Sequence, residues 1–170
     1  MPQRERPRER HALVLGGGTM GVGIIAMFIG GGWKVDVVSR SASTRDGLAA
    51  ATAKALAGMG KPTDTSRLKT FATLPEAGWS KIDVAVETVT EDLPLKQKLF
   101  AEMEALARPD AALTSNSSSF PISEIGKGLK TQSRMMGLHF FMPAHLIPLV
   151  EVVSSVHTER AEAERVGAIM

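Results

Sequence analysis

Six consecutive residues near the amino terminus, Gly16 to Gly21, fit the pattern G-x-G-x-x-G. In this pattern Gly16 permits a tight turn, Gly18 lets a pyrophosphate approach bare backbone, and Gly21 allows a helix to pack closely on a strand. The helix that starts at Thr19 and Met20 would present free N–H groups and the positive end of its dipole to the phosphates. The pattern therefore indicates a dinucleotide site if a strand precedes it and a helix follows; a glycine turn without a ligand is the alternative.

A second candidate cofactor contact lies about 20 residues further on, where an acidic residue usually binds the ribose 2′-hydroxyl. This position holds Ser39, followed by Arg40 and Ser41, whereas Asp36 lies inside the predicted strand and is poorly placed to reach beyond its end. A carboxylate would repel a 2′-phosphate, but a serine and an arginine can both bond to one. We therefore expect NADP to be tolerated or preferred; the alternative is that Arg40 stacks on the adenine while NAD is held by other contacts.

A histidine and a glutamate near the carboxyl end of the chain have side chains suited to proton transfer. His139 ends a predicted strand, and a neutral imidazole can accept a proton at physiological pH. Glu151 stands alone between Val150 and Val152, where burying a charge is unfavourable unless it is paired. The residues alone leave His139 open as a hydrogen-bonded core histidine, but they indicate that Glu151 has a partner.

Polar residues also follow two of the inner predicted strands. Asn116, Ser117 and Ser118 come directly after one of them, at the edge where open α/β sheets bind ligands. A capping turn before the next helix is the alternative, since serine and asparagine are favoured there. Glu91 and Lys96 lie at the start of a predicted helix, where a surface ion pair that suits the helix dipole would account for them equally well.

The elements that must position these residues alternate between short β-branched runs and longer helical patterns. This alternation is typical of an α/β fold with a doubly wound, mostly parallel sheet of the Rossmann type and helices on both faces. We predict strands at residues 12–15, 34–39, 68–72, 82–87, 111–115, 134–140 and 149–153. We predict helices at residues 19–29, 43–59 (capped by Ser43 or Thr44), 93–107, 122–129 and 158–170, the last without a stop signal.

Composition excludes several classes of protein. The 170 residues are 44% hydrophobic and 22% charged, within the globular range. Without cysteine there are no disulfides, thiolate zinc sites or cysteine nucleophiles, and no Asp/Glu/His cluster has metal-ligand spacing. The longest apolar run, residues 21–33, is too short to span a bilayer, and no secretory signal opens the chain. We expect a cytoplasmic protein that does not bind membranes.

The net charge of +2 comes entirely from residues 1–10, where four arginines face two glutamates. We expect this segment to be a disordered basic arm and residues 11–170 to form one domain. The domain carries sixteen basic and sixteen acidic residues. A neutral domain lacks the clustered cations that nucleic-acid binding needs, so we expect no nucleic-acid partner.

Four stretches together resemble the 3-hydroxyacyl-CoA dehydrogenase family: residues 15–23 (LGGGTMGVG), 86–100 (VETVTEDLPLKQKLF), 114–119 (TSNSSS) and 137–153 (GLHFFMPAHLIPLVEVV). The resemblance extends from residue 11 to the end, and its last two stretches are far more specific than the glycine loop. It implies an N-terminal Rossmann domain that oxidises a 3-hydroxyl with NAD. In the family a helical C-terminal domain supplies dimer contacts and part of the substrate pocket. Nothing here corresponds to that domain, so we expect a fragment of a longer, homodimeric parent.

The resemblance also assigns roles to individual residues. The family's catalytic histidine falls on His139 and its partner acid on Glu151, at the same twelve-residue spacing. The carboxylate would fix the tautomer of the imidazole and stabilise its protonated form. The counterpart of Ser118 contacts the reacting oxygen of the substrate, and the surroundings of Asn116 border the nicotinamide.

Further family positions are matched or replaced. Glu91 and Lys96 match residues that contact the cofactor. Met142 stands where the family usually has an asparagine beside the nicotinamide, and methionine cannot donate those hydrogen bonds. Ser39 replaces the usual aspartate. Residues 41–70, where the family contacts coenzyme A, show no convincing match, so an acyl-CoA substrate is an expectation from the rest of the resemblance.

We expect an oxidoreductase that transfers a hydride between a 3-hydroxyacyl substrate, an acyl-CoA, and a nicotinamide cofactor, with His139 as general base. One alternative is a dehydrogenase of a free 3-hydroxy acid such as carnitine or gulonate. Another is a non-catalytic dinucleotide-binding fragment. His11, His145 and His157 are expected to be surface or packing residues.

Overall fold

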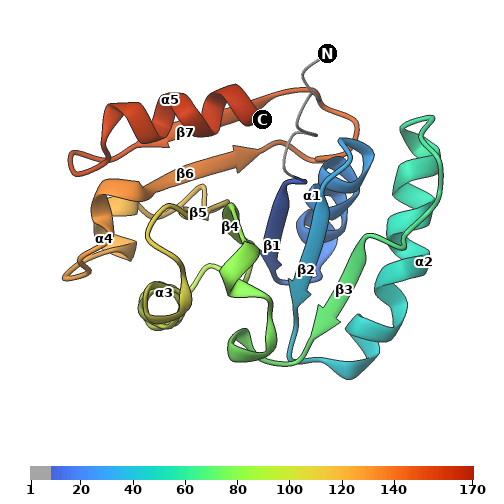
Figure 1. Cartoon of the computed structure of the whole chain (residues 1–170), viewed down its shortest axis with the longest axis horizontal. Coiled ribbons are helices and arrows are strands. Elements are labelled where there is room, and N and C mark those ends of the chain that lie inside the picture. Colours follow the sequence, from blue (N-terminus) through green and yellow to red (C-terminus); the bar gives the residue numbers. More distant parts are fainter. Residues whose placement is uncertain (1–8) are drawn as a thin grey trace, which may run out of the picture.

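The computed structural model describes residues 9–170, in which seven strands form one sheet with helices on both faces (Figure 1). The strands lie in the order β3-β2-β1-β4-β5-β6-β7; β1 to β6 are parallel, and β7 runs antiparallel to β6. Their bounds are β1 His11–Leu15, β2 Lys34–Val38, β3 Leu68–Phe71, β4 Val84–Glu87, β5 Ala112–Ser115, β6 Met135–Phe140 and β7 Val150–Ser154.

The helices divide between the two faces of the sheet. One core cluster receives side chains from three helices: α1 Thr19–Gly30, α2 Ala42–Gly58 and α5 Arg160–Ile169. The other receives them from α3 Leu93–Leu106 and α4 Ile122–Ile125. Three single turns of 3-10 helix complete the described chain: η1 Leu74–Glu76, η2 Trp79–Lys81 and η3 Gln132–Arg134. The predicted doubly wound, mostly parallel Rossmann sheet is confirmed.

Strand β1 shows why the central strands read as continuous apolar runs. Ala12 and Val14 enter the core cluster on one face, while Leu13 and Leu15 enter the cluster on the other. Successive side chains of a strand point to opposite faces, and helices cover both, so every position is buried. The same double burial makes β1 and its neighbours the rigid centre on which the loops at their carboxyl ends are built.

The helix boundaries differ from the sequence prediction by one to four residues, and the differences in α2, α4 and α5 are the most informative. The side chain that caps α2 is Ser41, which accepts from the Thr44 amide, and not Ser43 or Thr44. Helix α4 ends at Ile125, with Gly126 as its C-cap residue, and not at Leu129. Helix α5 begins at Arg160 and not at Thr158, because the Thr158 hydroxyl donates to the carbonyl oxygen of Met135 at 2.6 Å.

Most of the predicted basic arm lies outside the described residues, which begin at Glu9. Glu9 and Arg10, which the prediction placed in the arm, contact the domain instead. Glu9 pairs with Lys34 at 2.7 Å and with Arg67, and the Arg10 guanidinium lies 5.5 Å from the ring centre of Trp33. These charge and cation–π contacts fix both residues against the amino end of β2.

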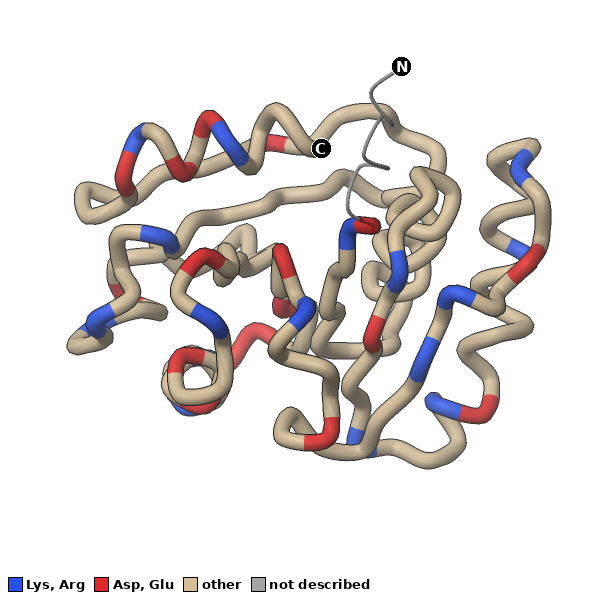
Figure 2. Tube along the Cα trace, viewed as in Figure 1, with Lys and Arg blue, Asp and Glu red and all other residues tan. Residues whose placement is uncertain are grey.

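Figure 2 shows basic and acidic residues interspersed over the elements of the described chain. This pattern matches the equal numbers of the two charges after residue 10. Within residues 9–170, none of the helices combines the length and the apolar character needed to cross a membrane.

A buried hydrogen bond between two side chains joins the amino end of β1 to β2. The His11 imidazole Nε2 lies 3.0 Å from Asp36 Oδ1, and Asp36 Oδ2 accepts from the Gly78 amide at 2.9 Å. Burial opposes ionisation of Asp36, but the hydrogen bonds from His11 and Gly78 outweigh it and hold the pKa of the carboxyl below its usual value. Asp36 is therefore a structural acid inside the strand, and His11 is its partner.

Replacing Asp36 with asparagine is expected to lower the free energy of unfolding at pH 7 by about 1 to 3 kcal/mol, because a buried partner is lost. A carboxyl whose folded-state pKa is lowered stabilises above its unfolded pKa, and this contribution disappears as pH falls through the folded value. The stability gap between wild type and Asp36→Asn should therefore shrink below about pH 4. Urea unfolding at pH 7 and pH 3 measures it; an unchanged gap contradicts the assignment.

Candidate functional site

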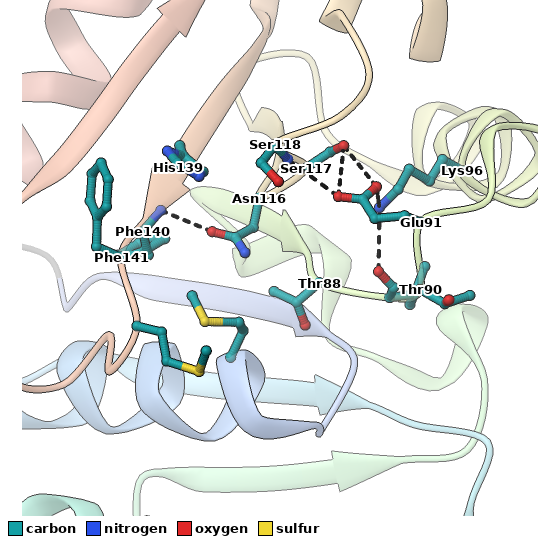
Figure 3. A pocket seen from close by; sticks show the side chains of 13 residues that line it. Thr88, Thr90, Glu91, Lys96, Asn116, Ser117, Ser118, His139, Phe140 and Phe141 are labelled. Atoms are coloured by element: carbon teal, nitrogen blue, oxygen red, sulfur yellow. Dashed lines mark hydrogen bonds and ion pairs between the residues drawn. The ribbon is translucent and has the colours of Figure 1, made fainter.

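Two cavities lie at the carboxyl edge of the sheet, where the strand order reverses between β1 and β4. We call them the Arg40 pocket, of about 470 Å³, and the His139 pocket, of about 370 Å³. The His139 pocket is lined by Met20, Thr88, Val89, Thr90, Glu91, Lys96, Asn116, Ser117, Ser118, His139, Phe140, Phe141 and Met142 (Figure 3). The Arg40 pocket is lined by Ser39, Arg40 and Ser41 after β2, by Gly16, and by residues of η1 and α3. Val89 and Thr90 line both cavities.

The glycine loop runs from one cavity to the other. Gly16 has a φ of 114°, and a Cβ there would lie 2.6 Å from Thr88 Oγ1. A Cβ on Gly21 would lie 2.2 Å from the Gly16 carbonyl oxygen, so the close helix–strand packing predicted for this position is present. A Cβ on Gly18 would meet nothing within 4 Å. The space in front of Gly18 is therefore open to a ligand.

The amino end of α1 faces that space without a competing side chain. Among the described residues none caps α1 through its side chain, and its first turn holds no acid. Helices α2 and α3, in contrast, are capped by Ser41 and Asp92. An uncapped helix start with free N–H groups and no negative charge suits a phosphate.

Arg45, which the sequence analysis did not single out, binds the backbone that follows β2. Arg45 Nη1 donates to the carbonyl oxygens of Ser39 at 2.6 Å and of Arg40 at 3.0 Å. The Arg40 side chain is exposed and lines its pocket, while Asp36 is buried below with its own partners. Arg45 lies in the first turn of α2. From the sequence alone, nothing distinguishes it from any other basic residue of a helix.

His139 and Glu151 face each other across β6 and β7. They are paired residues in the antiparallel register, and His139 Nδ1 lies 3.0 Å from Glu151 Oε2. A carboxylate can only accept, so Nδ1 carries the proton, and in the neutral imidazole Nε2 keeps a lone pair. The ring of Phe141 meets the imidazole edge-on, with 4.9 Å between centres. The contact with Glu151 thus sets the tautomer of the His139 imidazole.

Asn116 connects β5 to the strand that carries His139. Its side-chain oxygen Oδ1 accepts from the Phe140 amide at 2.9 Å. Because an amide N–H must meet the oxygen, the side-chain nitrogen of Asn116 points away from Phe140 and is available to donate within the pocket (Figure 3). The capping-turn alternative for this segment coexists with the site: Ser117 Oγ accepts from the amides of Ser119 and Phe120.

Glu91 holds the loop that carries Ser118. Its carboxylate accepts from the Ser117 hydroxyl at 2.8 and 3.0 Å and from the Ser118 amide at 3.2 Å, and lies 3.4 Å from Lys96 Nζ. The two side chains do contact each other, but the alternative of a pair on the surface is wrong, because the Lys96 side chain is buried and only 1% exposed. The main partner of Lys96 is Glu87, 0% exposed, at 2.8 and 2.9 Å.

Glu87 is a second residue of this site, besides Arg45, that sequence reasoning missed. A signal was present, since Glu87 ends an apolar strand in the same way that Glu151 interrupts one. Of the predicted residues, Gly16, Ser39 and Arg40 line the Arg40 pocket, and Glu151 contacts His139 without lining a pocket. The His139 pocket is lined by Met20, Glu91, Lys96, Asn116, Ser118, His139 and Met142, whereas Gly18, Thr19 and Gly21 line neither pocket. Among the described residues no group of three histidine or acidic side chains could hold a metal ion.

Comparisons with known proteins agree with this geometry. The family model described as "3-hydroxyacyl-CoA dehydrogenase, NAD binding domain" matches residues 11–170. The glyoxysomal fatty acid beta-oxidation multifunctional protein MFP-a of Brassica napus is 32% identical in an alignment of 152 residues that covers 85% of this chain and 21% of that protein.

Solved structures give the same result. The 3-hydroxybutyryl-CoA dehydrogenase of Escherichia coli K12 superposes with a TM-score of 0.81 at 30% identity, over 93% of this chain and 35% of that one. FadB2 of M. tuberculosis gives a TM-score of 0.83 at 32% identity, over 93% and 58%. This chain thus spans less than two thirds of each of these relatives. The match across residues 11–170 and the shared fold show that the chain belongs to the family of 3-hydroxyacyl-CoA dehydrogenase NAD-binding domains.

Proposed function

We propose that this chain binds NAD across the two pockets and that His139 is the general base in oxidation of a 3-hydroxyacyl substrate. The observation that carries the proposal is the 3.0 Å contact between His139 Nδ1 and Glu151 Oε2, which leaves Nε2 free to accept a proton. The His139 pocket adjoins the glycine loop through Met20, so proton acceptor and cofactor site share one cavity.

The residues of the chain divide the chemistry among them. Bound NAD supplies the hydride acceptor. His139 Nε2 takes the hydroxyl proton as hydride leaves the carbon, and the Glu151 carboxylate stabilises the resulting imidazolium. Ser118 and the amide nitrogen of Asn116 line the same cavity and can donate to the reacting oxygen.

The adenosine end of the cofactor belongs in the Arg40 pocket. Its walls after β2 are Ser39, Arg40 and Ser41, and the β2 acid, Asp36, is occupied by His11 and Gly78. Lys98 adds a cation and Glu102 an acid from α3. A guanidinium and hydroxyls at the strand end favour a 2′-phosphate, so we propose that NADP is accepted as well as NAD.

The substrate class is proposed as an acyl-CoA. The solved relatives include proteins named 3-hydroxybutyryl-CoA dehydrogenase, and apolar walls from Met20, Phe141 and Met142 suit an acyl chain. Met142 is 66% exposed at the mouth of the cavity. A thioether there adds apolar surface where a family asparagine would donate hydrogen bonds.

Gly18→Ala is expected to leave the fold intact and to weaken cofactor binding. The added Cβ meets no protein atom within 4 Å, but it occupies the space where the pyrophosphate must approach. We expect the Kd for NADH, measured by fluorescence titration, to rise about tenfold or more, a loss of at least ~1.4 kcal/mol. Gly47→Ala, which is equally unobstructed but lies on α2 away from both pockets, is the matched control. Unchanged affinity in Gly18→Ala contradicts the proposed phosphate site.

His139→Ala is expected to lower turnover with 3-hydroxybutyryl-CoA and NAD by about 10²- to 10⁴-fold, the usual loss for a general base. Replacement of the exposed His157 by alanine is the control and should leave turnover unchanged. Turnover is followed as NADH absorbance, with free 3-hydroxybutyrate and carnitine as competing substrates. A His139→Ala chain with full activity overturns the mechanism, and wild type that binds NADH but turns over none of the three is a nucleotide-binding module.

Arg40→Gln is expected to weaken NADPH binding more than NADH binding, because a 2′-phosphate loses a charge-assisted partner. A loss of about tenfold for NADPH, with little change for NADH, fits the usual strength of such a bond. Lys54→Gln removes an exposed charge from α2 outside both pockets and serves as control. Wild type that binds only NADH removes the NADP proposal.

A further inference from the structure

A fully buried carboxylate, that of Glu87, lies where the loops that follow β4 and β5 begin, and both loops line the His139 pocket. Glu87 is the last residue of β4 and is 0% exposed. Its Oε1 accepts from the Val89 amide at 2.6 Å and from Lys96 Nζ at 2.8 Å. Its Oε2 accepts from Lys96 Nζ at 2.9 Å and from the Ser115 hydroxyl at 2.6 Å. Four hydrogen bonds from three different segments therefore converge on one side chain.

These bonds satisfy a charge that would otherwise be strongly unfavourable. A buried ion pair is tolerated only with good geometry and with its remaining lone pairs occupied. Each carboxylate oxygen of Glu87 accepts two hydrogen bonds, and the cation that pairs with it, Lys96, is buried as well. A position that needed only core packing would be filled more simply by an apolar residue, as at the neighbouring Val86.

The hydrogen-bond partners of Glu87 belong to, or contact, both loops that line the His139 pocket. On one side, Val89 lines the cavity directly and receives its fixed orientation from Glu87. On the other, the Ser115 oxygen that is bonded to Glu87 accepts from the Ser117 amide at 3.1 Å. Lys96 then reaches Glu91, whose carboxylate holds the Ser117 hydroxyl and the Ser118 amide.

We propose that Glu87 is a positioning residue that fixes the two loops of the His139 pocket through Val89, Ser115 and Lys96, and so sets the binding of the nicotinamide half of the cofactor. The inference rests on the proposed function, which places that half in this pocket. Glu87 itself does not line the cavity, so it acts through the residues it holds. Glu87 affects the Arg40 pocket only through Val89 and Thr90, which line both cavities.

The experiment compares NADH with ADP-ribose, which lacks only the nicotinamide. Glu87→Gln keeps the shape of the side chain but removes the charge and the fourfold acceptor pattern. We expect NADH affinity to fall by about tenfold to a hundredfold, the scale of loss when a supporting contact shifts a site by a fraction of an ångström to one ångström. ADP-ribose affinity should change by less than about threefold. The emission of bound NADH should also move toward that of the free cofactor.

Asp36→Asn is the matched control, since Asp36 is also a buried acid of the sheet with a basic partner but lies away from the pocket. It should lose stability while the ratio of the two affinities stays at the wild-type value. If Glu87→Gln fails to fold, Ser115→Ala replaces it: this change keeps the Glu87–Lys96 pair but breaks the link to Ser117. Ser115→Ala should still lower NADH affinity selectively, by about threefold.

Equal loss of NADH and ADP-ribose affinity in a folded variant overturns the proposal, because it signals general loosening of the domain. Wild-type binding of both ligands by Glu87→Gln, or by Ser115→Ala where the first variant does not fold, overturns it as well. A wild-type chain that binds ADP-ribose but not NADH instead rejects the proposed function of the His139 pocket, so the two failures are distinguishable.

Discussion

The parallel pairing of β1, β4, β5 and β6 is the constraint on which the site depends. It brings four carboxyl ends to one edge, so that the glycine loop, Glu87, Asn116 and His139 meet although they are far apart in the sequence. The strand that breaks this rule is equally important. Because β7 is antiparallel to β6, its register puts Glu151 directly opposite His139. A shift of β7 by one residue would turn Glu151 to the other face and leave the imidazole without its acceptor.

Around this edge the same polar groups hold the loops and present the functional side chains. Asn116 satisfies the Phe140 amide with its oxygen and thereby directs its nitrogen into the cavity. Glu91 closes the turn at Ser117 and Ser118 while facing Lys96. Each of these bonds ties a residue of one loop to a different segment of the chain. The loops around the pocket are therefore held by the chain's own contacts.

Local patterns predicted most of this fold because its elements are short, doubly buried strands and well-separated helices. The β-branched run and the glycines that follow it placed β1, its loop and α1, and the spacing of His139 and Glu151, read through the family resemblance, matches their pairing in β6 and β7. What the patterns could not supply are partners chosen by tertiary contact. The Asp36–His11 pair joins residues 25 positions apart, and Glu87 collects donors from α3 and β5. The cap of α2 failed for a related reason: Ser41, Ser43 and Thr44 are all good caps, and only the path of the chain out of β2 selects Ser41.

The solvent exposure of His139 and Glu151 determines the strength of the electrostatic interaction between their side chains. The His139 side chain is 25% exposed and Glu151 is 53% exposed, so water screens the attraction between a protonated imidazole and the carboxylate. The same two charges at the same 3.0 Å would interact several times more strongly in a medium of lower dielectric constant. Covering this face of β6 and β7 would therefore strengthen that attraction. Glu87 and Lys96 show the other limit, because there the chain itself excludes the water and supplies every partner. The two acids thus differ by burial: Glu87 accepts four hydrogen bonds inside the chain, whereas Glu151 meets His139 in contact with water.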